Sequence, residues 1–352
     1  MEGYSRMIKI GIVGTGSTFG IAHYHAQGVL LDGRACVSAV FSHNKERAGK
    51  WVSDHGLSSR VCNSYEELLD NVDAVVICTP NAFHCNQVLQ AIEAGKHILV
   101  EKPVAITADE CKLLREACVG YGKVNMAGFS NRSSGIVLSA RKIIREQMGK
   151  VFLFSAWFGG KRLADPSVPL EWRMQRSLSG SGALGDFGSH AVDLADFMCS
   201  QRYDEVSCMT AKYIAERPLG KVENDDVALF QGRSNNGLGS FSMSRVGMTD
   251  TMIAIAGEGG LMELDFSGSG RLFYTEKKLN GPYTGKTAEI VPEKPSDFSS
   301  NLASQMTAFI DAIKGVESKA SANIADVNQG CYVENVLLAA EKASETRYCQ
   351  EL

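Results

Sequence analysis

The sequence predicts a two-domain α/β protein, in which a doubly wound parallel sheet is followed by an α+β domain with an open, mostly antiparallel sheet. Strand and helix patterns alternate through residues 1–128, and short apolar runs follow one another over 205–275. Alternating βα units form parallel sheets, whereas closely spaced short strands are typical of antiparallel ones. The length of 352 residues also exceeds that of one usual domain. We therefore expect one domain at 1–128 and a second at 129–352.

Buried strands and capped helices make up the first half of the chain. Apolar runs without polar alternation are typical of strands covered on both faces. Asn44 and Ser64 are N-cap residues by type and position, and Gly56 and Gly95 are helix stops. The expected strands are 7–13, 35–41, 74–78 and 97–100, and expected helices are 45–55 and 86–94.

The pattern changes after Phe129. A Gly/Ser-rich stretch leads into a helical segment at 187–199, and residues 276–300 have the composition of a surface loop. For the last helix we also consider packing against the first domain. The remaining expected helices are 136–148, 302–314 and 326–346, and the strands are 151–158, 227–230, 240–246, 252–256 and 261–266.

Composition indicates an ordinary globular protein with a small-molecule partner. Hydrophobic residues make up 44% and charged residues 22%, and the net charge of -4 offers no general attraction for nucleic acid or an anionic membrane. No apolar run has the length of a membrane span. The ten cysteines form no Cys-x-x-Cys pair, and the first residues lack the pattern of a signal peptide. We expect reduced thiols, no metal site and a cytoplasmic protein.

A glycine-rich turn follows the first strand and precedes a predicted helix. In this setting backbone N–H groups approach a pyrophosphate, as in a Rossmann dinucleotide-binding domain. The third glycine of the usual G-x-G-x-x-G falls at Phe19, and the next glycine comes one residue late. A plain β-turn is the alternative. The expected cofactor-binding residues are Gly14, Thr15, Gly16, Ser17, Thr18, Phe19 and Gly20.

The end of the second strand carries no acidic residue. An NAD enzyme usually places Asp or Glu here for the ribose hydroxyls, and a carboxylate would repel the 2′-phosphate of NADP. This strand ends in Ser42 and His43, followed by Lys45, all of which can donate to a phosphate. The absence of acid favours NADP(H), with NAD(H) as the other candidate. A solvated turn would show the same residues.

Polar residues also follow two further strands of the predicted parallel sheet. The carboxyl ends of such strands line the ligand crevice, so these residues are expected to face the cofactor. Lys102 would place a charge at the mouth of the site. The residues of this group are Thr79, Pro80, Asn81 and His84 after one strand and Glu101 and Lys102 after the next.

Asp186 and His190 stand four residues apart in the second domain, so they share one face if the segment is helical. A lysine, a histidine and a carboxylate on one cleft suit alcohol oxidation by hydride transfer, which needs a proton acceptor and a group that stabilises the alkoxide. Each also has an ordinary explanation: a solvated lysine, a structural histidine, a helix-capping aspartate. A metal site is a weaker alternative.

Taken together, these segments resemble the glucose–fructose oxidoreductase, inositol dehydrogenase and MocA (Gfo/Idh/MocA) family. The resemblance rests on the glycine loop, Thr-Pro-Asn-x-x-His at 79–84, Glu-Lys-Pro at 101–103, Trp172-Arg173, Asp186-x-x-x-His190 and Gly-Glu-x-Gly at 257–260. It implies an open sheet domain that covers the nicotinamide and often makes the subunit interface of a homodimer or homotetramer. It also implies catalytic roles for Lys102 and His190, with Asp186 on the substrate, and a cis Lys102-Pro103 bond.

The expected function is therefore an NAD(P)-dependent dehydrogenase or reductase acting on a hydroxyl-bearing carbon of a sugar, sugar derivative or cyclic polyol. Trp157 or Trp172 is a candidate for stacking on the sugar, and Arg173 or Arg132 for binding its polar groups. Two alternatives stay open. One is a dinucleotide-sensing regulator without catalysis, and the other is a glycoside hydrolase that uses bound NAD in a closed redox cycle.

Overall fold

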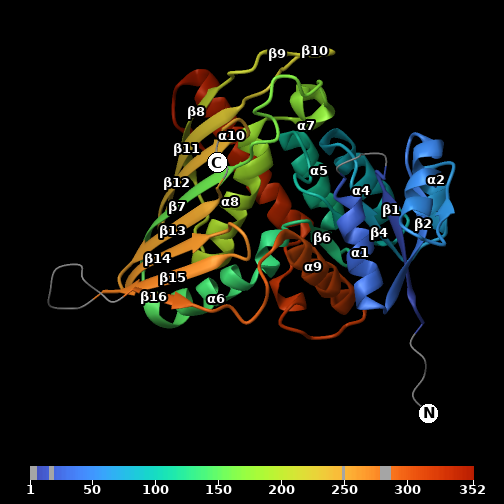
Figure 1. Ribbon diagram of the computed structural model, residues 1–352, viewed down its shortest axis with the longest axis horizontal. Helices are drawn as coiled ribbons and strands as arrows, with labels where there is room; N and C mark the ends of the chain where they lie inside the picture. The colour runs from blue at the N-terminus through green and yellow to red at the C-terminus, as the bar shows by residue number, and fades with distance from the viewer. Residues whose placement is uncertain (1–5, 16–19, 248–249, 278–286) are drawn as a thin grey trace. The chain divides into compact units, whose positions relative to one another are not determined.

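The computed structural model describes residues 6–15, 20–247, 250–277 and 287–352, which form two compact units (Figure 1). Unit 1 contains the described residues up to Ala105 together with residues 109–130 and 299–331. Unit 2 contains residues 106–108, 131–298 and 332–352.

Unit 1 is built on a six-stranded parallel sheet of order β3-β2-β1-β4-β5-β6. The chain leaves β1 in one direction to β2 and β3 and returns on its other side to β4, so the strand order reverses next to β1. In such sheets ligands bind beyond the carboxyl ends of the strands at this reversal. The predicted doubly wound sheet is confirmed, with β1 at Ile8–Val13, β2 at Ala35–Phe41, β3 at Arg60–Val61, β4 at Ala74–Ile77, β5 at His97–Val100 and β6 at Asn125–Ala127.

Two helices of unit 1, α2 and α3, begin at the caps that the sequence predicts. Asn44 accepts the Arg47 N–H at 2.9 Å, and Ser64 accepts the Glu67 N–H at 3.1 Å. Gly56, with φ of 60°, follows α2. The helices are α1 at Ala22–Asp32, α2 at Lys45–Asp54, α3 at Tyr65–Asp70, α4 at His84–Glu93, α5 at Ala108–Cys118 and α9 at Phe298–Ile313.

The core of unit 1 joins segments far apart in the sequence. Met306 and Phe309 of α9 are fully buried in the same cluster as Val29 of α1 and the apolar residues of β1 and β2. α1 and α9 approach closely at Gly28, where a Cβ would lie 2.8 Å from the Met306 Cβ. α9 therefore completes the packing around α1, beside which Figure 1 shows it.

Unit 2 contains a nine-stranded sheet of order β16-β15-β14-β13-β7-β12-β11-β8-β17. Its neighbours pair antiparallel except β7 and β12, which are parallel, so the predicted mostly antiparallel sheet is confirmed. The strands are β7 at Val151–Gly159, β8 at Glu205–Ala211, β11 at Val227–Ser234, β12 at Gly237–Ser244, β13 at Met252–Gly257, β14 at Gly260–Asp265, β15 at Arg271–Glu276, β16 at Thr287–Ile290 and β17 at Gln350–Glu351, with a separate hairpin of β9 (Glu216–Arg217) and β10 (Gly220–Lys221).

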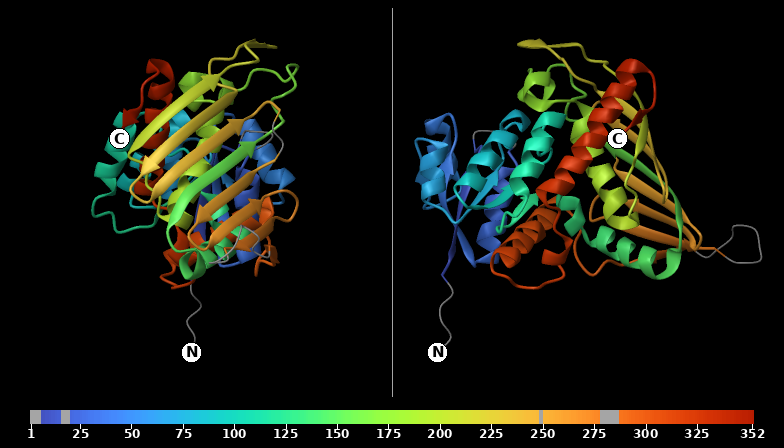
Figure 2. Two further views of the ribbon diagram at one scale, coloured as in Figure 1. Left: turned by 90° about the vertical axis from the view of Figure 1, so that its left-hand side faces the viewer. Right: turned by 180° about the vertical axis from the view of Figure 1, so that it is seen from behind.

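Two helices lie against one face of this sheet, α8 (Ala183–Cys199) over β7, β11 and β12 and α6 (Gly135–Ile143) over β14 and β15. The left view of Figure 2 shows the other face, which no helix of the described residues covers. Large apolar side chains are exposed along the strands, among them Leu153, Trp157, Leu229, Leu238 and Met252. The remaining helices are α7 at Arg176–Ser179 and α10 at Val327–Thr346.

In the second half, two expectations were wrong and one helix was confirmed. α8 begins at Ala183 and not at 187, because its first N–H groups are bonded by a residue distant in sequence. The expected helix 136–148 is confirmed, as α6 continued by a π-helical turn at Ile144–Met148. The expected loop 276–300 contains β16, a largely exposed edge strand whose composition carries no apolar alternation.

Candidate functional site

The glycine turn after β1 lies where the strand order of unit 1 reverses. Gly14 has φ of 95°, and a Cβ there would lie 2.5 Å from the carbonyl carbon of Cys78. Its N–H donates to the Phe41 carbonyl at 3.0 Å. The turn is therefore packed against the ends of β2 and β4, and only glycine fits. Gly20 follows as a half-buried residue before α1. Gly16, Ser17, Thr18 and Phe19 lie outside the described residues.

This turn fits the pyrophosphate of a dinucleotide. Thr15 is 3% exposed, and among the described atoms its hydroxyl has no hydrogen-bond partner. Buried polar groups normally find a partner, and a phosphate oxygen would supply one.

The turn between β2 and α2 carries the residues expected at the ribose. Ser42 is half-buried and His43 is exposed. Asn44 is used as the cap of α2, and the Lys45 ammonium donates to Asn63 at 2.7 Å. Ser42 and His43 are thus the donors that directly follow β2.

The loops after β4 and β5 are tied together inside unit 1. His84 is 1% exposed, and its ring nitrogens lie 2.7 Å from the Pro103 carbonyl and 2.8 Å from the Thr79 carbonyl. The Thr79 hydroxyl donates to Gln87 at 2.6 Å. Lys102 is half-buried between Glu101 and Pro103, and the Lys102-Pro103 bond is cis, as expected. Pro80 and Asn81 follow Thr79 and are half-buried.

Glu101 points into unit 1 and meets a histidine to which the sequence gave no particular role. Its Oε1 lies 2.7 Å from Nε2 of His25, which is fully buried. The carboxylate also lies against Gly128, where a Cβ would be 3.0 Å from Oε1. Burial raises the pKa of the Cys78 thiol well above its usual value, and the Glu101 charge adds to the effect. His25 lies on the buried face of α1 with Ala22 and its neighbours. Its helical spacing from these apolar residues could have predicted that it is buried.

In unit 2, α8 carries both Asp186 and His190, one helical turn apart and half-buried, as their spacing predicts. The His190 ring stacks with Phe158 of β7 at 6.3 Å between centroids. The first turn of the helix is bonded by Asp225, whose carboxylate accepts the Gly182 N–H at 2.7 Å and the Leu184 N–H at 2.8 Å. Asp225 lies about 40 residues further along the chain, so no local pattern pointed to it.

A buried polar network fixes the backbone beside Trp172. Asn224 and Arg245 each donate to the Arg173 carbonyl at 3.0 Å, and they are hydrogen-bonded to each other. Arg245 also approaches Asp226 at 3.4 Å. The Arg173 guanidinium lies 4.3 Å over the Trp172 ring. The structure thus brings together Trp172 and Arg173, which the sequence proposed as sugar contacts.

Two other candidates are engaged elsewhere in unit 2. Arg132 donates to both oxygens of Asp193 on α8, at 2.8 and 2.6 Å, and this pair is buried. Trp157 is 43% exposed on the uncovered face of the sheet, whereas its neighbour Phe158 points to α8. Successive strand residues face opposite sides, so Trp157 lies on the face of the sheet opposite to Phe158 and His190. Lys102 belongs to unit 1, and Asp186 and His190 belong to unit 2.

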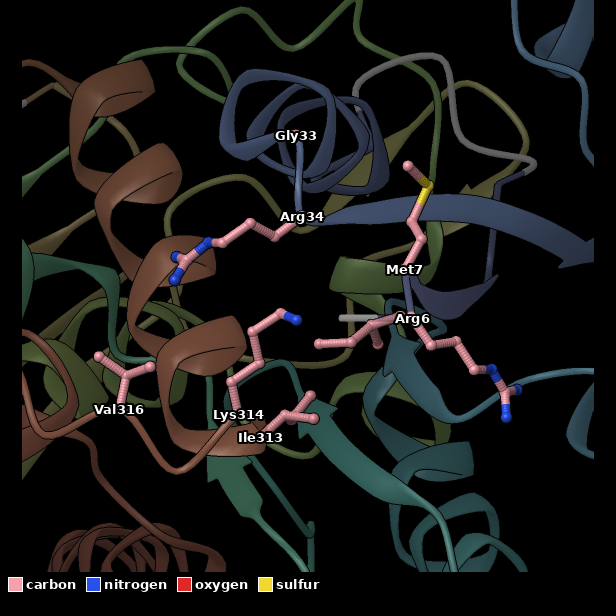
Figure 3. A pocket seen from close by; sticks show the side chains of 8 residues that line it. Arg6, Met7, Gly33, Arg34, Ile313, Lys314 and Val316 are labelled. Atoms are coloured by element: carbon pink, nitrogen blue, oxygen red, sulfur yellow. The ribbon is translucent and has the colours of Figure 1, made fainter. Parts of the chain in front are cut away.

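A hollow of 770 Å³ in unit 1 contains none of the expected cofactor or catalytic residues (Figure 3). It lies at the amino ends of β1 and β2, where Arg6, Arg34 and Lys314 line it. The Arg34 guanidinium is engaged by Asp32 and Asp311, each at 2.7 Å, and these bonds raise its pKa. Ligands of parallel sheets bind at the carboxyl ends of strands, so this hollow is not the candidate site.

In the described ranges no group of three or more His, Cys, Asp or Glu side chains is arranged to hold a metal ion. All ten cysteines are free thiols. Across the same ranges no helix combines the length and the apolar character that crossing a membrane requires.

A parallel sheet with a glycine turn at its reversal point, followed by a mixed-sheet domain, defines a two-domain protein of the dinucleotide-binding class. Residues 8–129 match the model of the Gfo/Idh/MocA oxidoreductase family, NAD-binding Rossmann fold, and residues 137–263 match the Gfo/Idh/MocA C-terminal domain. The two matches cover well over half of the chain, which belongs to the Gfo/Idh/MocA oxidoreductase family. The resemblance and the Rossmann fold expected from the sequence are confirmed.

Individual relatives include sugar and inositol dehydrogenases. A levoglucosan dehydrogenase of Pseudarthrobacter phenanthrenivorans is 32% identical over 245 residues, which span 68% of this chain and 61% of that protein, less than two thirds of its length. An inositol 2-dehydrogenase/D-chiro-inositol 3-dehydrogenase of Shouchella clausii is 25% identical, covering 86% of this chain and 83% of that protein. A solved levoglucosan dehydrogenase in complex with NADH and levoglucosan shares the fold, with a TM-score of 0.89 at 23% identity over 98% of this chain and 99% of the other.

Proposed function

We propose that this protein is an NAD(P)-dependent dehydrogenase or reductase acting on a CH–OH group of a sugar, sugar derivative or cyclic polyol. The observation that carries the proposal is the pair Asp186 and His190 on one face of α8, together with Lys102 two residues after the end of β5 in a Rossmann unit. Relatives named for levoglucosan and inositol support this substrate class.

Each residue has a chemical role in this proposal. When bound, the nicotinamide ring supplies the acceptor or donor of the hydride. His190 accepts the proton of the substrate hydroxyl during oxidation and returns it during reduction. Lys102 donates to the same oxygen and stabilises the negative charge that develops there. Asp186 accepts a hydrogen bond from a neighbouring hydroxyl and so orients the substrate.

Further contacts follow from the same proposal. Trp172 and Arg173 contact the sugar, since an aromatic face packs against C–H groups and a guanidinium binds hydroxyls. Gly14 to Gly20 hold the pyrophosphate, and Thr79 to Asn81 lie along the cofactor. Ser42 and His43 favour NADP(H) over NAD(H), because neither repels a 2′-phosphate.

We also propose a homodimer or homotetramer formed through the uncovered sheet face of unit 2. The exposed apolar residues there form cross-strand pairs, with Leu153 opposite Leu238 and Trp157 opposite Met252. Contiguous exposed apolar surface of this kind is typical of interaction sites.

A dehydrogenase screen with both dinucleotides tests the proposed class. Levoglucosan, inositols and simple aldoses are offered with NAD⁺ and NADP⁺, and reduced nicotinamide is followed by its absorbance. We expect substrate-dependent reduction with at least one polyol. Dinucleotide binding without turnover of any substrate would favour a regulator, and glycoside cleavage without net absorbance change would favour the NAD-dependent hydrolase.

A further inference from the structure

His84 links two loops of unit 1 through carbonyl oxygens. It is the first residue of α4, and its ring lies between the Thr79 carbonyl after β4 and the Pro103 carbonyl after β5. At 1% exposure the side chain is shielded from solvent. The sequence placed His84 at the cofactor, but both of its ring nitrogens face groups of the protein.

The chemistry of these contacts constrains the proton on the ring. Carbonyl oxygens only accept hydrogen bonds, and a neutral imidazole has a single N–H to donate. Burial lowers the pKa of His84 and outweighs its hydrogen bonds to the Pro103 and Thr79 carbonyls and the charges of Glu101 and Glu110, all of which favour the doubly protonated ring. At neutral pH the ring therefore donates to one carbonyl at a time. The Nδ1 contact with Pro103 is the shorter of the two.

The Pro103 carbonyl directly follows the residue to which we assign the oxyanion role. On the other side of Lys102, the Glu101 N–H donates to the Ile77 carbonyl of β4 at 2.9 Å, and the Glu101 carboxylate bonds the buried His25. The backbone before Lys102 is thus fixed by β4 and α1. After Lys102, the side chain of His84 provides the corresponding attachment.

We propose that His84 is a positioning residue, whose Nδ1–H donates to the Pro103 carbonyl and holds the backbone that carries Lys102. The role of Lys102 in turnover rests on the proposed function, whereas the hydrogen bond and its effect on the loop do not. A displacement of about 1 Å at a reacting group can cost a factor of about 100 in rate, so this attachment should be visible in kcat.

Two amide substitutions separate the two contacts. The side-chain nitrogen of Asn occupies the position of Nδ1, so His84→Asn keeps a donor for Pro103. The nitrogen of Gln occupies that of Nε2, so His84→Gln keeps a donor for Thr79 alone, and His84→Ala keeps neither. His97→Asn is the matched control, because His97 accepts the Val124 N–H at the opposite end of β5. Thermal unfolding of all four variants reports the loss of packing separately.

Three readouts decide the matter: amide hydrogen exchange of the peptide over residues 99–106, dinucleotide affinity, and kcat. We expect exchange and kcat in His84→Asn and His97→Asn to stay within about 3-fold of wild type. In His84→Gln and His84→Ala, exchange should rise and kcat fall by about 10- to 100-fold, with dinucleotide affinity changed by less than about 3-fold. Equal exchange and equal kcat in the Asn and Gln variants would overturn the inference.

A measurement on the unaltered protein applies even if the His84 variants do not fold. ¹⁵N-histidine NMR at neutral pH should show His84 with hydrogen on Nδ1 and none on Nε2. Hydrogen on Nε2 alone would refute the proposed bond. Hydrogen exchange and NMR need no turnover, so they test the role of His84 independently of catalysis. A protein inactive on every polyol would refute the proposed function, but it would not affect these two measurements.

Discussion

At the scale of single residues, the proposed preference for NADP(H) rests on Ser42 and His43 at the end of β2. The 2′-phosphate of NADP is close to a dianion near neutral pH, and Ser42 and His43 offer donors where a carboxylate would repel it. Asn44 and Lys45 are already used by the cap of α2 and by Asn63. Ser42 and His43 are therefore the residues on which the proposed preference can be tested.

Replacing Ser42 by Asp should weaken NADP(H) binding by at least about 10-fold and leave NAD(H) binding equal or improved, because only the 2′-phosphate meets the new charge. Fluorescence titration with NADPH and NADH measures both affinities. Ser42→Asn, polar and uncharged, is the control and should change the NADPH to NADH ratio by less than about 3-fold. Clearly tighter NADH binding by wild type, with NADPH affinity unchanged in the Asp variant, would show that these residues do not read the ribose.

Residue types with distinctive backbone needs were predictable from sequence, whereas side-chain direction was not. Gly14 and the caps Asn44 and Ser64 lie where local chemistry puts them. Glu101 and His84 stand in loops at the carboxyl ends of strands, yet both side chains turn inward. Which way they point depends on partners such as His25, which no sequence spacing relates to them.

At the scale of the elements, the exact start of α8 matters for the proposed catalytic site, because the first two turns of this helix carry Asp186 and His190. A helix N-terminus leaves unpaired N–H groups that need an acceptor. Here Asp225 supplies both oxygens from the segment before β11. The sequence predicted the helix from its apolar face but placed the start four residues late, since the acceptor is far away in the chain. β16 was missed for a related reason, as only pairing with β15 defines it.

Removing this acceptor should loosen the start of α8. We expect Asp225→Ala to lower the free energy of unfolding by about 1–3 kcal/mol and kcat by about 10-fold or more, because two charge-assisted bonds are lost and the first helical turn frays. Denaturant unfolding and steady-state kinetics provide the two numbers.

The control is Asp265→Ala, which removes a carboxylate bonded to the Ser267 N–H at 2.8 Å in the turn after β14. It should cost less than about 1 kcal/mol and leave kcat within about 2-fold. If both alanine variants lose the same activity, the start of α8 does not depend specifically on Asp225.

At the scale of the whole molecule, the order of element types was enough to predict a parallel sheet followed by a mostly antiparallel one. The period of the apolar residues and the length of each apolar run distinguish buried parallel strands from short strands with alternating polar and apolar residues. The place of α9 is different: its apolar residues complete the core around α1, some 270 residues earlier in the chain. An apolar face shows that a helix packs against another element, but it does not show which element that is.

We propose that Lys102 and His190 act on the reacting hydroxyl and not on cofactor binding. The most direct test of this proposal is to measure turnover and dinucleotide affinity in Lys102→Ala and His190→Ala, beside Lys96→Ala, which removes a lysine just before β5 whose ammonium donates to the Val72 carbonyl. We predict that kcat falls by about 10²- to 10⁴-fold in the first two, with dinucleotide affinity within about 3-fold, and that Lys96→Ala stays near wild type. Near-normal turnover in both the Lys102 and His190 variants would contradict the account.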